Sequence, residues 1–150
     1  MLLAGFATAC TPAMNWRETP LDGMSILLPC KPDRAQRRVH LAEQDVPLTM
    51  AGCEAAGVLF AITHVVVAGE TAASTMAAWR SITLANMQAT VATEVAVNRI
   101  ATQGKRPDGT PVQAQLAWIV AGHDIYQIAV YADRLTPDML DNLFSEIKVQ

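Results

Sequence analysis

In this chain of 150 residues, the three cysteines are the residues whose chemistry can be predicted most directly from the sequence. Cys10 ends the apolar run of residues 1–10, and the small residues Ala7, Thr8 and Ala9 stand immediately before it. Small residues ahead of a cysteine are typical of a bacterial lipobox, where cleavage of a signal leaves a cysteine that carries lipid. We therefore expect Cys10 to be lipidated and to anchor the protein to a membrane of the bacterial envelope. The alternative is a free cysteine in a frayed N-terminus.

The leader before Cys10 lacks Lys and Arg ahead of its apolar stretch and is shorter than the roughly 15–30 residues of a complete secretory signal. We expect a longer leader upstream of Met1. Residues 11–20 include Pro12 and Pro20 and few apolar side chains, which is typical of a tether. The chain then divides into a signal remnant at 1–10, a tether at 11–20 and a single domain at 21–150.

Cys30 and Cys53 form the remaining pair. In an oxidising periplasm we expect them to form a disulfide, whereas a reducing cytosol would leave them as small buried apolar residues. The bridge would close a loop of a little over twenty residues and stabilise the fold by roughly 3 kcal/mol.

Sequence motifs for catalysis and metal binding are absent. The chain has no CxxC, no HExxH, no GxSxG, no Walker loop and no GxGxxG. We expect no catalytic residues, no metal and no cofactor, and therefore a protein that is not an enzyme.

The histidines offer the remaining route to catalysis. We expect His40 to be exposed on a strand, His123 to lie in a hairpin turn, and His64 to be buried and hydrogen-bonded for stability. An alternative is that Glu54 tunes His64 as a base. An enzyme built around His64 or His123 is thus a further class of function.

The composition is that of an ordinary globular domain, with 51% hydrophobic residues, 17% charged residues and a net charge of -3. The one basic cluster, at residues 31–38, is short and is interpreted as a solvated loop, so we expect no nucleic-acid partner. Beyond the leader no run reaches the roughly 18–20 apolar residues that span a bilayer.

The first half of the domain contains short apolar runs separated by turn residues, which predict an antiparallel meander. Residues 59–67 are continuously apolar rather than alternating, which indicates a central strand covered on both faces. The expected strands are residues 24–29, 38–41, 46–53 and 58–67.

The sequence of the second half of the domain predicts two helices and further strands. Ser74 offers an N-cap for a helix at 74–89. Thr136, Pro137 and Asp138 favour the start of a second helix. A hairpin turn at 121–124 is expected between two strands, and one short strand closes the chain. The expected strands are 95–103, 112–120 and 125–131, with an exposed loop at 104–110.

This order predicts an α+β domain in which a single twisted antiparallel sheet of about six to eight strands is packed by two helices. The opening strand 24–29, the helix around Trp79, the hairpin at Gly122 and the closing stretch 144–149 resemble the PsbP/DcrB-like α/β/α sandwich superfamily. The alternative is a cystatin-like fold, in which the sheet wraps around a helix. The superfamily includes envelope lipoproteins, photosystem accessory subunits, a Ran-binding protein and secretion-effector chaperones. The resemblance implies a function in binding or assembly. It implies no catalytic residue for this chain.

Several functions remain open from the sequence. We expect a periplasmic, membrane-anchored lipoprotein that binds a protein partner through its sheet edge or the loop at 104–110. An alternative is a periplasmic carrier of a small apolar ligand, with Trp79 and Trp118 lining a groove between helix and sheet, although such residues more often belong to the core. A chaperone-like module is the alternative for a cytosolic protein.

Overall fold

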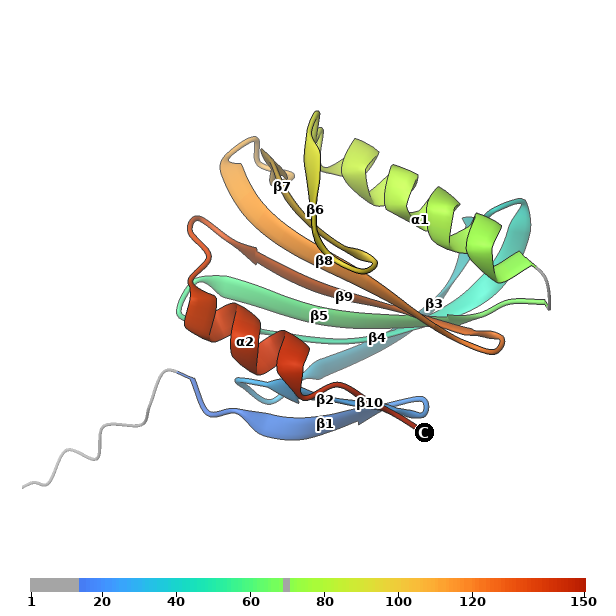
Figure 1. The fold of residues 1–150 in the computed structure, drawn as a ribbon, viewed down its shortest axis with the longest axis horizontal. Coiled ribbons are helices and arrows are strands. Elements are labelled where there is room, and N and C mark those ends of the chain that lie inside the picture. The colour runs from blue at the N-terminus through green and yellow to red at the C-terminus, as the bar shows by residue number, and fades with distance from the viewer. Residues whose placement is uncertain (1–13, 69–70) are drawn as a thin grey trace, which may run out of the picture.

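The computed structural model describes residues 14–68 and 71–150, so Cys10 lies outside the described residues. Figure 1 shows the arrangement of the elements. The strands are β1 (Arg17–Leu21), β2 (Met24–Leu28), β3 (Asp33–Leu41), β4 (Gln44–Ala55), β5 (Val58–Val66), β6 (Ala92–Ala96), β7 (Arg99–Lys105), β8 (Pro111–Ala121), β9 (Asp124–Ala132) and β10 (Lys148–Val149), and the helices are α1 (Ala72–Asn86) and α2 (Pro137–Ser145).

A seven-stranded antiparallel sheet, hereafter the large sheet, forms the centre of the domain in the order β3-β4-β5-β9-β8-β7-β6. The domain is therefore α+β, as the sequence predicts. The predicted hairpin is confirmed, because Ala121 pairs with Asp124 and Gly122 supplies the positive φ of 62° in the turn. The predicted start of α2 is also confirmed, with Pro137 as its first residue.

A second sheet corrects the prediction of a single one. β2 pairs with β1 and β10 rather than with the meander. This small sheet lies with α2 on one side of the large sheet, while α1 lies on the other side (Figure 1). The expected tether is also wrong in part, because residues 17–20 belong to β1. The apolar face of β2 packs against the large sheet: Met24, Ile26 and Leu28 are all buried in the core between the two sheets.

Another strand boundary differs from the prediction. Residues 95–103 are not one strand; they divide between the hairpin strands β6 and β7, whose turn contains Asn98 at a φ of 54°. Asn is one of the few residues other than Gly that adopts this conformation readily. Helix α1 also begins at Ala72, after Thr71, so Ser74 is inside its first turn and is not the N-cap.

The hydrophobic core has two parts, one on each face of the large sheet. Phe60 and Ile62 of β5 pack towards the small sheet and α2, whereas Val65 of the same strand packs towards α1. Successive side chains of a strand point to opposite faces, so a continuous apolar run suits a strand that is covered twice. β5 and its neighbour β9 are such strands.

The two layers on the small-sheet side are joined covalently. Cys30, which follows β2, forms a disulfide with Cys53 of β4. The predicted pair is therefore present in the structure. Since β2 and β4 belong to different sheets, the bridge fixes the small sheet against the large one.

The bridge yields a stability prediction. The variant Cys30→Ala/Cys53→Ala should lose about 3 kcal/mol of unfolding free energy, because the unfolded chain gains the freedom of the loop. Urea denaturation of the oxidised wild type and the variant measures the difference. Dithiothreitol should lower the stability of the wild type by a similar amount and leave the variant unchanged. A reductant effect on the double variant would contradict this account.

Candidate functional site

The largest cavity described is a groove of about 770 Å³ between α1 and the large sheet. Its wall on the helix side includes Trp79, Ile82 and Met87. Ligand sites in proteins commonly have volumes of about 300–1,000 Å³ and mainly apolar linings. The floor is apolar along β4, β5 and β9 and includes Leu48, Met50, Leu59, Ala61 and Ala129.

The groove exists because one helix is too narrow for this sheet. Seven strands spaced about 4.8 Å apart make a face about 29 Å wide, whereas a helix with its side chains is about 10–12 Å across. The only helix on this face among the described residues is α1. Part of the apolar face therefore stays uncovered beside it.

Two contacts hold α1 at a fixed place over the sheet. The side-chain amide of Gln127 on β9 donates to Thr83 Oγ1 at 2.9 Å. At the end of the helix, the backbone N–H of Lys105 donates to the carbonyl of Met87 at 2.7 Å. Gly104 permits this approach, because a Cβ there would lie only 2.5 Å from the Met87 oxygen. The helix wall of the groove is thus tied to β9 and to β7.

The two tryptophans predicted to line a groove differ in position. Trp79 lines the groove, whereas Trp118 is buried in the core beneath α1 and is not part of the lining. The indole N–H of Trp118 has no hydrogen-bond partner within residues 14–68 and 71–150. One of the two residues predicted from the sequence therefore belongs to the candidate site.

Two apolar residues of the groove face solvent, which the sequence patterns do not predict. Ile82 belongs to the helix expected at 74–89, and it is 43% exposed. Leu59 belongs to the strand that the sequence predicts to be covered on both faces, and it is 42% exposed. Both line the groove. They are exposed because the sheet is wider than the helix that covers it, and the width of the sheet cannot be predicted from the pattern of neighbouring residues.

Polar groups lie at the rim of the groove. The lining includes the cations Arg37, Lys105 and Arg106 and the carboxylate Glu54. Tyr131 also lines the groove, and burial raises the pKa of its phenol. The phenol therefore stays protonated at neutral pH and remains a hydrogen-bond donor.

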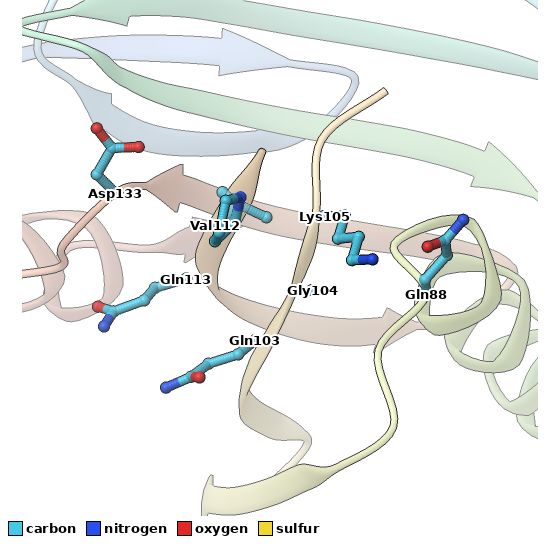
Figure 2. A pocket seen from close by; sticks show the side chains of 8 residues that line it. Gln88, Gln103, Gly104, Lys105, Val112, Gln113 and Asp133 are labelled. Atoms are coloured by element: carbon cyan, nitrogen blue, oxygen red, sulfur yellow. The ribbon is translucent and has the colours of Figure 1, made fainter. Parts of the chain in front are cut away.

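A smaller polar pocket of about 320 Å³ adjoins one end of the groove, and Lys105 and Val112 line both. Figure 2 shows the side chains of Lys105 and Gln88 on the helix side of β7, with Gln103 and Gln113 pointing the other way. Amides and an ammonium group offer donors to a polar ligand. The pocket thus adds polar character at the Lys105 end of the groove.

A histidine cluster lies on the opposite face of the large sheet. His64 Nδ1 is 3.1 Å from Asp22 Oδ2, and its Nε2 is 2.6 Å from Asp124 Oδ1. The ring stacks on Tyr126, whose hydroxyl donates to the Asp22 carbonyl at 2.5 Å. Burial, followed by the charges of Asp124 and Asp22, raises the pKa of Tyr126, so its hydroxyl stays protonated as a donor.

The cluster corrects the expectation that Glu54 tunes His64. Glu54 lines the groove on the α1 side, whereas His64 packs with Tyr126 on the other side. Asp22 follows β1, Asp124 begins β9, and His64 is in β5. The cluster therefore ties the β1–β2 turn to two central strands of the large sheet, which agrees with the predicted structural role of His64.

The cluster lies away from both cavities. The two carboxylates lie at opposite nitrogens of a ring that is 8% exposed, and neither cavity described above reaches it. Within residues 14–68 and 71–150, no three His, Cys, Asp or Glu side chains gather as metal ligands. His40 is exposed on β3, and His123 is in the hairpin turn, both as predicted.

Comparisons with known proteins add little. No family model matches the chain, and no curated protein matches it either. A solved structure from Bacteroides thetaiotaomicron VPI-5482 is similar at 10% sequence identity, with a TM-score of 0.44. The match covers 85% of this chain and 45% of that one, so this chain spans less than half of its length. Neither described helix has the length and apolar character needed to cross a membrane.

The His64 cluster yields a second stability prediction. His64→Gln should lose about 1.5–3 kcal/mol of unfolding free energy, because hydrogen bonds to charged groups are removed from a buried ring. His40 and Asp45 offer the matched control, since they form a similar pair at 2.9 Å but both are exposed. His40→Gln should change stability by about 0.5 kcal/mol or less. Urea denaturation measures both, and equal losses would contradict a structural role for the cluster.

Proposed function

We propose that this protein is a non-enzymatic binding protein of the bacterial envelope that holds a small apolar ligand in the groove between α1 and the large sheet. The observation that carries the proposal is the groove itself, with a volume of about 770 Å³ and an apolar floor that α1 leaves open. A carrier of a small apolar ligand is among the functions that the sequence leaves open. The geometry supports it better than it supports catalysis or the docking of a protein partner.

The exposed apolar side chains favour a ligand. Leu59 and Ile82 stand at the groove with much of their surface in water. Each Å² of apolar surface removed from water contributes roughly 25 cal/mol, so a ligand chain that covers them gains affinity. Contiguous exposed apolar surface on a soluble protein commonly marks a binding site.

The chemistry of the groove favours binding over catalysis. Gln127 and Thr83 are hydrogen-bonded to each other, and the Thr83 hydroxyl also donates to the Trp79 carbonyl at 2.9 Å. These groups fix α1 and do not form a nucleophile with an adjacent base. The His64 cluster packs on the other face of the large sheet.

An envelope location is part of the same proposal. The disulfide between Cys30 and Cys53 suits an oxidising compartment, and the lipobox pattern before Cys10 suits a lipid anchor. The placement of α1 and α2 on opposite faces supports membership of the PsbP/DcrB-like sandwiches. The ligand would then be held near a membrane surface.

A second candidate function is contact with a protein partner at the free edge of the large sheet. β6 is the last strand in the sheet order, and exposed apolar side chains surround it: Val91, Val95 and Val97. An edge strand presents unpaired backbone groups that can accept a strand from another chain. The loop at 104–110 is the other surface that the sequence offers to a partner, and its residues 107–110 are exposed.

The groove yields a binding prediction. N-phenyl-1-naphthylamine, a neutral apolar fluorophore, should bind the wild type with a rise in fluorescence. Leu59→Lys should weaken this binding by about tenfold or more, because it places a charge where apolar surface is buried. Fluorescence titration measures the dissociation constants.

Val120→Lys is the matched control. Val120 is 42% exposed, like Leu59, but is not part of the groove. It should bind the fluorophore as the wild type does. If both variants bind equally well, or if the wild type does not bind, the proposed function is wrong.

The envelope location yields a further prediction. Protein recovered from its native membrane fraction should lack residues 1–9, carry acyl chains on Cys10 and have a mass two protons below the reduced form. Intact-mass measurement before and after reduction and alkylation tests all of these points. An unmodified chain with free thiols at Cys10, Cys30 and Cys53 would contradict the proposal.

A further inference from the structure

We propose that the ligand is a single-chain amphiphile whose anionic head lies beside Lys105, with its chain along the groove. This inference deepens the proposed function and rests on it. It follows from the length of the groove and from the uneven placement of charge around it.

The groove extends far along the strands and also across them, from β3 to β7. On β4 it extends from Leu48 to Glu54, and β-strands rise about 3.3 Å per residue, so this wall is about 20 Å long. Leu48 pairs with Arg37 at one end, and Glu54 is level with Leu59 and Tyr131 towards the other. An extended chain of roughly a dozen methylenes suits a groove of this length better than a compact ligand does.

The cations that line the groove differ in their partners. Arg106 is paired with Asp133, whose oxygen is 2.8 Å from the Arg106 guanidinium. Neither Lys105 nor Arg37 forms an ion pair with any residue among 14–68 and 71–150. Glu54 is on β4, four strand spacings or about 19 Å from β7, so it does not neutralise Lys105.

Lys105 also lines the smaller polar pocket, which Arg37 does not line. Gln88 lines that pocket too, and the pocket's one carboxylate, Asp133, is paired with Arg106. Figure 2 shows Gln88 facing the same side as Lys105. An ammonium group with an amide donor nearby is complementary to an anionic head that has several acceptor oxygens. The head is therefore assigned to the Lys105 end and the chain to the apolar floor.

The test compares dodecyl phosphate, dodecanol and dodecyltrimethylammonium, all below their micellar concentrations, by calorimetric titration of the purified, disulfide-bonded protein. We expect dodecyl phosphate to bind about tenfold more tightly than dodecanol and more tightly than the cation. Lys105→Gln should remove most of this advantage, so that dodecyl phosphate and dodecanol bind with similar affinity. Arg37→Gln is the matched control, because it removes an equal charge from the other end of the groove and should retain the advantage.

The outcomes separate the two proposals. If none of the three dodecyl compounds binds, the proposed function itself fails. Equal binding of all three compounds would overturn only the inference that the head is anionic. If Arg37→Gln rather than Lys105→Gln loses the preference for dodecyl phosphate over dodecanol, the placement of the head beside Lys105 is wrong. Inorganic phosphate should bind far more weakly than dodecyl phosphate; equal affinity would overturn the amphiphile. Thermal unfolding of each variant checks that its fold is retained.

Discussion

The structure depends on one constraint: the two faces of a wide antiparallel sheet must both be covered, and the chain provides unequal covers. β5 and β9 at its centre carry apolar residues on both faces. On one face the small sheet and α2 together form a second layer. On the other face α1 is a single helix of about 10–12 Å in diameter over a sheet about 29 Å wide. The groove is the part of this face that remains uncovered.

The two faces are held in different ways. The small-sheet face is held by the Cys30–Cys53 disulfide and by the contacts of His64 with Asp22 and Asp124, which join turns and strands of both sheets. On the groove face, α1 is held by non-covalent contacts, among them the hydrogen bonds of Gln127 with Thr83 and of Lys105 with Met87. The small-sheet face thus has a covalent link that α1 lacks, and α1 leaves a preformed groove of a size common among ligand sites.

The sequence predicts those features that depend on neighbouring residues. The hairpin at Gly122, the proline at the start of α2 and the class of fold follow from local signals, and each is present. The small sheet could not be predicted, because alternation along β2 shows that one face is buried but not which strand it pairs with. The groove could not be predicted for a related reason. Trp79 and Trp118 have the same apolar character, and only the path of α1 across the sheet decides which of them lines a cavity.

The central claim is that the uncovered face beside α1 is where an apolar chain binds. The most direct measurement is paramagnetic broadening of backbone amide signals by a dodecyl chain that carries a nitroxide. The account predicts the strongest broadening at Met50, Ala61 and Thr83, which line the groove, and much weaker broadening at Glu18 and Ser25 in the small sheet on the opposite side. Broadening that is strongest on the side of the small sheet and α2, or spread evenly over the surface, would contradict it.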